Sequence, residues 1–151
     1  MHHKRSFRRK LQTFFLSLLL VLLTVAGVPS AAYTAEAASA DTTMAVHFLD
    51  VGQGLSILVQ SQGQNLLYDG GDRGHSSFVV SYLQKQNISI IDYMISSHYD
   101  EDHVAGLVGC LDSFSVKNVI GADYVQDTKI YQSFENSVAA QGLTVQHPEP
   151  G

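Results

Sequence analysis

One short segment restricts the fold of this chain more than any other: the run HYDEDH at residues 98–103, which holds two imidazoles and three carboxylates. Residues 90–96 end one residue before it, and their β-branched side chains predict a buried strand. The apolar residues that follow are spaced i, i+3, i+4, i+7 over residues 104–111, which is typical of a helix packed on a core. The chain must therefore form a strand, a polar loop and a helix in immediate succession.

The types and spacing of these polar residues are those of a metal site. In an extended loop, side chains two residues apart point the same way, so His98, Asp100 and Asp102 can lean toward one side. His103, at the start of the expected helix, can turn toward a second point nearby. Nitrogen and oxygen ligands of this kind suit Zn²⁺, Mn²⁺ or Fe. A bound cation would also offset the repulsion among the neighbouring acids.

A second interpretation of the same run needs no metal. The acids could form the N-terminal capping loop of the following helix, with Asp102 as the cap and the other carboxylates stabilised by the helix dipole. In either case Tyr99 and Glu101 alternate to the opposite side of the loop, where we expect them to face solvent or the sheet.

The rest of the body alternates between short strand patterns and amphipathic helix patterns. Strands are expected at residues 44–51, 56–60, 65–68, 90–96, 116–120 and 143–146, with a hairpin turn at 61–64. Helices are expected around residues 78–83, 104–111 and 130–138. The order β-β-β-α-β-α-β-α-β predicts a mixed α/β (α+β) fold in which helices cover a sheet.

Local signals mark where two of these helices begin or end. Ser76 or Asp72 is the candidate N-cap of the first helix, and Asp127 is the candidate N-cap of the third. Gly142 lies where a C′ glycine would end the third helix.

Residues 1–40 have the three parts of a secretory signal peptide: a basic start, an apolar run and a stretch of small residues. Ala38 and Ala40 predict cleavage before Asp41, and residues 30–32 offer a second candidate site. The apolar run is shorter than the ~20 residues of a membrane span, and an uncleaved anchor is the alternative. We expect a secreted or extracytoplasmic protein that meets the membrane only through this segment, with residues 41–151 forming one domain or part of one.

The body of the chain is acidic. From Asp41 onward it has 4 Lys and Arg against 13 Asp and Glu, a net charge of −9, because five of the nine basic residues lie in the first ten positions. This balance excludes a strong basic surface for nonspecific binding of nucleic acid. The single cysteine, Cys110, excludes an internal disulfide framework.

Three motifs together resemble those of a known family. They are HFLDVGQG at residues 47–54, LLYDGG at 66–71 and SHYDEDHVAG at 97–106. In this order and spacing they resemble the metallo-β-lactamase superfamily, and most of all its competence-type DNA-uptake branch, which is bacterial. The resemblance implies an αββα sandwich with a metal site at the edges of its sheets.

The resemblance also assigns roles to individual residues. His98 and Asp100 would bind one divalent ion, Asp102 and His103 a second, with Zn or Mn as the candidates. Asp100 stands where most of the superfamily has a second histidine. Asp102 would also be the catalytic residue that holds the attacking water. Asp69 would be a supporting acid near the metals, or alternatively a turn former at a strand end.

The chain departs from the family pattern in two ways. Leu55 replaces the acidic residue that usually follows DVGQG in the competence-type branch. The bridging Asp and later His ligands of the family have no counterpart before Gly151, so we expect residues 41–151 to be the N-terminal part of a truncated domain. The residues that bind substrate stay unassigned.

Two functions follow from these patterns. The first is an exported hydrolase that uses metal-activated water, with a small-molecule or nucleic-acid phosphodiester as the favoured substrate and a lactam as an open alternative. The second is an inactive fragment or a non-catalytic exported module.

The remaining histidines are expected to play other parts. His47 is read as a packed or edge residue of the first strand, and His75 as a solvated loop residue. His147 is read as part of a strand end and not as a metal ligand.

Overall fold

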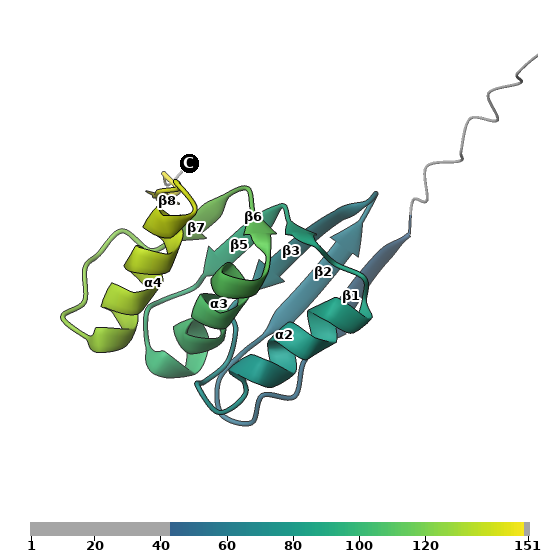
Figure 1. The fold of residues 1–151 in the computed structure, drawn as a ribbon, viewed down its shortest axis with the longest axis horizontal. Coiled ribbons are helices and arrows are strands. Elements are labelled where there is room, and N and C mark those ends of the chain that lie inside the picture. The colour runs from purple at the N-terminus through teal and green to yellow at the C-terminus, as the bar shows by residue number, and fades with distance from the viewer. Residues whose placement is uncertain (1–42, 150–151) are drawn as a thin grey trace, which may run out of the picture. The chain divides into compact units, whose positions relative to one another are not determined.

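The computed structural model describes residues 43–149, and its main feature is a six-stranded sheet in the order β1-β2-β3-β5-β7-β8 (Figure 1). Its strands are β1 (Met44–Phe48), β2 (Ile57–Ser61), β3 (Gln64–Tyr68), β5 (Tyr93–Ser96), β7 (Val119–Gly121) and β8 (Val145–Gln146). A second sheet consists of β4 (Ile90–Ile91) and β6 (Ser115–Val116). The helices are α2 (Ser76–Lys85), α3 (Glu101–Ser113) and α4 (Lys129–Ala140).

The main sheet changes from antiparallel to parallel along its width. Strands β1, β2 and β3 pair antiparallel, and β3, β5, β7 and β8 pair parallel. The predicted turn between β2 and β3 is confirmed: Gln62 and Gly63 both have positive φ, 51° and 77°, which suits a two-residue hairpin turn. In the parallel part, the carboxyl ends of the strands meet along one edge.

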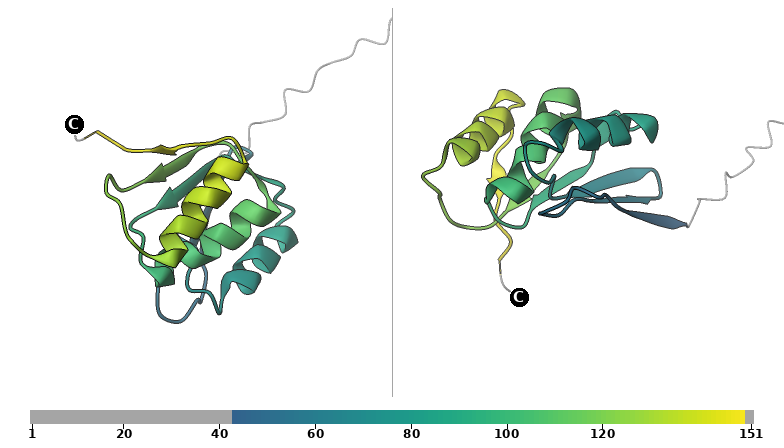
Figure 2. Two further views of the ribbon diagram at one scale, coloured as in Figure 1. Left: turned by 60° about the vertical axis from the view of Figure 1, so that its left-hand side comes forward. Right: turned by 90° about the horizontal axis from the view of Figure 1, so that it is seen from below.

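All three helices cover the same face of the main sheet, and α3 lies between α2 and α4 (Figure 2). The core between the two layers is apolar, with Leu67, Met94 and Val119 of the sheet fully buried against residues such as Leu107 and Phe134 of the helices. The mixed α/β prediction is therefore confirmed. The described residues supply one main sheet and one helix layer of the expected αββα sandwich.

The other face of the sheet has no helix over it among the described residues (Figure 2). Met44, Val46 and Phe48 alternate along β1, and their exposed fractions are 66%, 42% and 78%. Because residues two apart on a strand share a face, these three side chains form one apolar stripe.

Two of the predicted strands are divided in the structure. Residues 90–96 form β4 and β5, separated at Asp92, and residues 116–120 form the end of β6 and part of β7. The interruption follows from the bonds of Asp92: its N–H donates to the Asn65 carbonyl, and its carboxylate accepts from the Asn65 N–H and from Lys117 Nζ. The prediction of continuous strands was wrong because partners distant in sequence break the ladder here.

The helix caps also differ from expectation. The N-cap of α2 is His75, without a side-chain cap bond, while Asp72 Oδ1 accepts from the His75 N–H at 2.9 Å. The N-cap of α4 is Thr128, whose hydroxyl accepts from the Tyr131 N–H, and not Asp127.

The predicted end of α4 is confirmed, since Gly142 follows the helix with φ at +72°. Cys110 lies on the buried face of α3, and burial raises the pKa of its thiol to about 12. The predicted signal peptide at 1–40 lies outside the described residues. Within those residues, no helix has the length and apolar character to cross a bilayer.

Candidate metal centre

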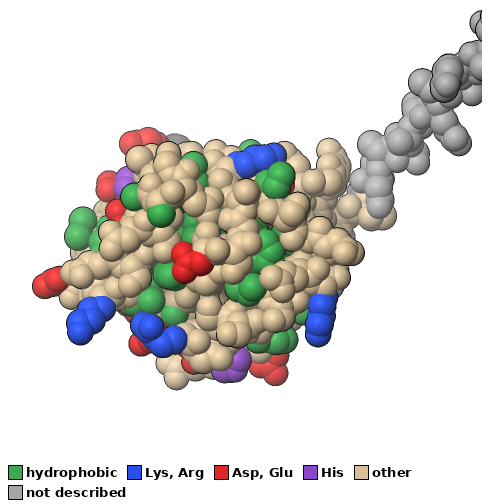
Figure 3. All heavy atoms as spheres, viewed as in Figure 1, with side chains coloured by type: hydrophobic (Ala, Val, Ile, Leu, Met, Phe, Trp, Pro, Cys, Tyr) green, Lys and Arg blue, Asp and Glu red, His purple; other side chains and the backbone are tan. Residues whose placement is uncertain are grey.

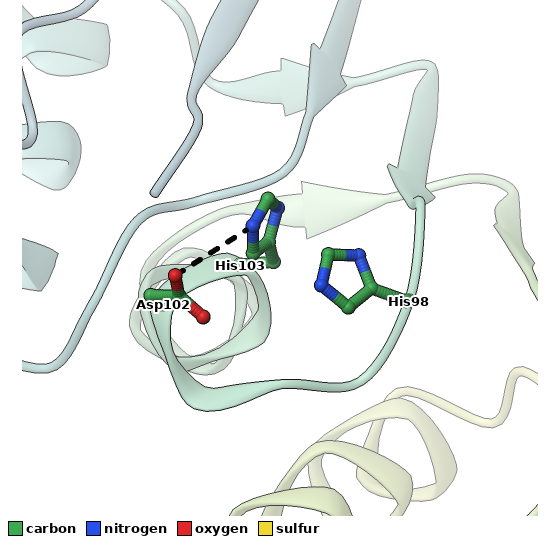
Figure 4. Close-up of side chains that lie close together, drawn as sticks. All are labelled: His98, Asp102 and His103. Carbon is green, nitrogen blue, oxygen red and sulfur yellow. Dashed lines mark ion pairs between the residues drawn. The ribbon is translucent and has the colours of Figure 1, made fainter. Parts of the chain in front are cut away.

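The polar loop and the first turn of α3 place three potential ligands together. His98 follows β5, and Asp102 and His103 lie in the first turn of α3. One ligand atom from each of the three lies within 4.8 Å of the others. Figure 4 shows the two imidazole rings facing one another, with the Asp102 carboxylate beside His103.

The ligand atoms in this group lie somewhat farther apart than they would around a bound ion. The ring centroids of His98 and His103 are 3.9 Å apart, and His103 Nε2 lies 3.8 Å from Asp102 Oδ2. Zinc bonds of about 2.0–2.1 Å in a tetrahedron place neighbouring ligand atoms ~3.4 Å apart. A small closure of these side chains would therefore complete the contacts to an ion.

Asp100 lies beside this group and not within it. Its Oδ2 is 3.5 Å from His98 Nε2, while its Oδ1 accepts from Gln126 Nε2 at 3.1 Å. Of the four predicted ligands, the structure thus brings three into one cluster and places the fourth next to His98. That the four bind metal stays a prediction.

The carboxylate of Asp69, which directly follows β3, supports the cluster from within the protein. Asp69 is fully buried and has a left-handed backbone, with φ at +56°. Its Oδ2 lies 2.8 Å from His103 Nδ1. Since an ionised carboxylate can only accept, His103 donates from Nδ1 and is left with Nε2 as its ligand atom.

Ser97 connects the same carboxylate to the second imidazole. Its N–H donates to Asp69 Oδ1 at 2.8 Å, and its hydroxyl donates to Asp69 Oδ2 at 2.6 Å. The Ser97 oxygen then accepts from His98 Nδ1 at 2.9 Å, which leaves His98 Nε2 free to bind metal. One buried acid therefore orients both imidazoles.

The sequence predictions included Asp69 as a supporting acid but gave Ser97 no role. The signal that could have identified Ser97 is its position: it lies between a buried strand and a candidate His ligand. A hydroxyl at that point can both donate and accept.

Glycines allow the loop after β3 to contact the start of α3 directly. The Gly70 N–H donates to the His103 carbonyl at 2.7 Å, and the Gly106 N–H donates to the Gly71 carbonyl at 3.1 Å. A Cβ at Gly70 or Gly106 would collide with the backbone of the other. This close approach brings Asp69 within reach of the first turn of α3.

The side chain of Tyr99 anchors the polar loop in the core. Of its two expected positions, solvent is wrong, because Tyr99 is 1% exposed, and the sheet is confirmed, because its hydroxyl lies against Gly121 of β7. Its ring also packs against Tyr131 and Phe134 of α4. Its hydroxyl donates to the Ala122 carbonyl at 2.7 Å, and burial raises its pKa to about 12. Glu101 does face solvent, where it pairs with Arg73.

The capping interpretation does not describe these acids. The N-cap of α3 is Asp100, which makes no side-chain cap bond, and Asp102 lies inside the first turn. The negative charge of Glu101 and Asp102 still suits that end of the helix.

The other described histidines lie outside the cluster. His47 Nδ1 contacts the Tyr82 hydroxyl at 2.8 Å, and His75 Nδ1 contacts Asp72 at 2.7 Å on the surface. His147 Nδ1 lies 3.2 Å from the Gly121 carbonyl.

A family model for the metallo-beta-lactamase superfamily matches residues 49–129, a range that contains the whole cluster and Asp69. The chain belongs to the metallo-β-lactamase superfamily. Members of this superfamily usually bind divalent metals, and the His98, Asp102 and His103 group is a possible site for one.

Relatives within the superfamily include competence proteins. The chain is 39% identical over 77 residues to Recombination protein 2 of Haemophilus influenzae, covering 48% of this chain and 10% of that protein. It is 36% identical over 63 residues to Competence protein ComA of Neisseria gonorrhoeae, covering 41% of this chain and 9% of that one. The chain therefore spans about a tenth of the length of these relatives.

Solved metallo-β-lactamases are more distant. The SMB-1 enzyme bound to 2-mercaptoethanesulfonate is 22% identical, with a TM-score of 0.44 over 50% of this chain and 29% of that one.

Proposed function

We propose that this chain carries the metal site of an exported hydrolase that cleaves phosphodiester bonds. The observation that carries the proposal is the buried Asp69, which contacts His103 Nδ1 directly and His98 Nδ1 through Ser97, and so leaves both Nε2 atoms available in a cluster with Asp102. Burying a carboxylate such as Asp69 costs free energy unless its hydrogen-bond partners compensate. Acids that merely lie on a surface seldom have a buried carboxylate of this kind beneath them.

In this proposal His98, Asp102 and His103 hold one divalent ion, Zn or Mn, and Asp100 supports a second. When bound, such an ion lowers the pKa of a coordinated water and offsets negative charge in the transition state. The Asp102 carboxylate would accept a hydrogen bond from the attacking water and orient it. Asp69 keeps both imidazoles in the tautomer that binds metal.

The competence and recombination relatives support a phosphodiester over a lactam as substrate. The charge of the molecule favours a small or short diester. Figure 3 shows Lys and Arg side chains at the margins of the face it displays, with acids between them. Such a face offers little to the backbone of a long polynucleotide.

The test is metal content and turnover of the purified chain. We expect about one or two equivalents of metal by elemental analysis and slow hydrolysis of bis(p-nitrophenyl) phosphate. His98→Ala should remove most of both.

The matched control is His75→Ala, since His75 also pairs with an aspartate but lies outside the cluster. It should change neither metal content nor turnover. If neither the wild-type chain nor the His75→Ala variant binds metal, the proposal is overturned and a non-catalytic module is favoured.

Export is tested separately. We expect the mature protein to begin at Asp41, which mass spectrometry of protein from the culture medium or periplasm would detect. Recovery of the intact first forty residues on a cytoplasmic chain would contradict export.

A further inference from the structure

A hollow of about 320 Å³ adjoins the metal centre, where the start of α3 faces the start of α4. Asp100 lines it and also reaches the cluster, with its Oδ2 3.5 Å from His98 Nε2. Gln126 lines it too and donates to the other oxygen of Asp100. A group bound in this hollow would therefore lie beside the bond that the metal centre cleaves.

Half of the basic residues of the acidic body line this one hollow. They are Arg73 and Lys129, two of the 4 Lys and Arg that follow Asp41. Lys117, by contrast, is paired with Asp92. Two further hollows among the described residues, one beside the β2–β3 hairpin and one beside β8, have no Lys or Arg in their walls. Positive charge is thus concentrated where the chain can place it beside a substrate.

These two cations retain capacity to bind an anion. Lys129 makes no ion pair with any described residue, and the pair of Arg73 with Glu101 uses Nε at 3.2 Å. The terminal nitrogens of Arg73 are left to bind a further acceptor. The Thr128 hydroxyl accepts from the Tyr131 N–H, so its own proton is available to donate into the hollow.

The two carboxylates of the hollow do not cancel this charge in the loaded site. Asp100 would lie beside a metal bound at His98, which would offset its negative charge. Glu101 pairs only with Arg73, so it neutralises part of the charge of Arg73 and none of that of Lys129. The groups that remain are donors: an ammonium, guanidinium nitrogens and a hydroxyl. Phosphate oxygens are the acceptors that fit such a set.

Resting on the proposed function, we propose that this hollow binds a second phosphate of the substrate, next to the diester that is cleaved. The substrate then carries a second phosphate group on the unit next to the diester that is cleaved, as in a nucleotide with a further phosphate. A compound whose only phosphorus group is the diester would bind less well. Arg73 and Lys129 determine this specificity.

Two substrates that differ by one phosphate test the proposal: thymidine 5′-(p-nitrophenyl phosphate) and the same compound with a 3′-phosphate. We expect the metal-loaded chain to have a KM about tenfold lower for the second. Each of Arg73→Gln and Lys129→Gln should reduce this ratio by about fivefold or less, and the double variant should bring it near one. Lys85→Gln, a change in the last turn of α2, is the control and should preserve the ratio.

A binding measurement separates failure of this inference from failure of the proposed function. Thymidine 3′,5′-bisphosphate, added to the Zn²⁺-loaded chain, should shift the amide signals of residues 126–130, and the double variant should lose these shifts. Binding without turnover of either substrate would overturn the hydrolase proposal and leave the phosphate site supported. Turnover of both substrates with equal KM, or shifts that persist in the double variant, would overturn the phosphate site.

Discussion

Two buried carboxylates lie at opposite ends of the neighbouring parallel strands β3 and β5, and their partners give them different roles. Asp69 follows the carboxyl end of β3 and is 0% exposed, and Asp92 precedes the amino end of β5 and is 6% exposed. Asp69 binds Ser97 and an imidazole. Asp92 binds the backbone of Asn65 and the ammonium of Lys117.

The difference shows how a partner decides what a buried acid does. The Lys117 ammonium holds the pKa of Asp92 below its ordinary value of 3.8, and the pair ties β5 to its neighbours. The imidazole partner of Asp69 is itself a potential ligand, so this acid orients a reactive group. The candidate metal centre thus lies at the carboxyl ends of the parallel strands, where α/β sheets usually have their ligand sites.

The strongest test of the carboxyl end is Gly106→Ala. The added methyl would collide with the Gly70 carbonyl, a backbone group that cannot rotate away. We expect a loss of about 3 kcal/mol in the free energy of unfolding, measured by urea denaturation.

Gly109→Ala is the matched control in the same helix. Its methyl would meet the Ser76 hydroxyl, which can rotate, so we expect a change within about 1 kcal/mol. Equal losses in the two variants would show that the contact between Gly70 and Gly106 is not tight.

Asp69→Asn tests whether this acid serves the metal. Asparagine tolerates the φ of +56°, but its amide presents N–H to a site where three donors need acceptors. Zinc affinity, measured against a competing chelator, should fall about 10- to 100-fold. Asp92→Asn should leave zinc affinity unchanged, and a similar fall in both would refute the contrast.

Asp92→Asn tests the structural acid. It weakens one hydrogen bond from Asn65 and the pair with Lys117, and we expect a loss of roughly 1–2 kcal/mol in the free energy of unfolding. Lys117→Met should cost a similar amount, and the double variant should cost less than the sum. Additive losses would mean that the two side chains act independently.

The smallest expected effect is on the pH dependence of stability. Because folding lowers the pKa of Asp92, its contribution is fully present above the unfolded carboxyl pKa of about 4 and is lost as pH falls through the folded value. The stability difference between the wild-type chain and Asp92→Asn should therefore shrink from about pH 5 to pH 3. A difference that stays constant over that range would exclude the pairing as its source.

The sequence was sufficient for the order of elements and for the loop at 98–103, because both depend on local patterns of apolar and polar residues. It was not sufficient for Asp92, which interrupts a strand through partners 25 to 27 residues away. Tyr99 was predicted only in part for the same reason: alternation gave its side of the loop and its contact with the sheet, but α4 reaches it only in the folded chain.

The candidate site was predictable in part. Residue types and spacing placed His98, Asp100 and Asp102 on one side of the loop and His103 toward a second point nearby. The structure instead groups His98 with Asp102 and His103, because the Gln126 bond that holds Asp100 at the rim exists only in the folded chain. Ser97 was overlooked because a serine carries no distinctive sequence signal until its three contacts are known.

The single thiol makes the stability of the site directly measurable. Cys110 is on α3, the helix whose first turn carries Asp102 and His103, and it is 0% exposed with a pKa of about 12. A maleimide reagent can modify it only when α3 separates from the sheet. The rate of labelling thus reports how often the site comes apart in native buffer, without an engineered probe.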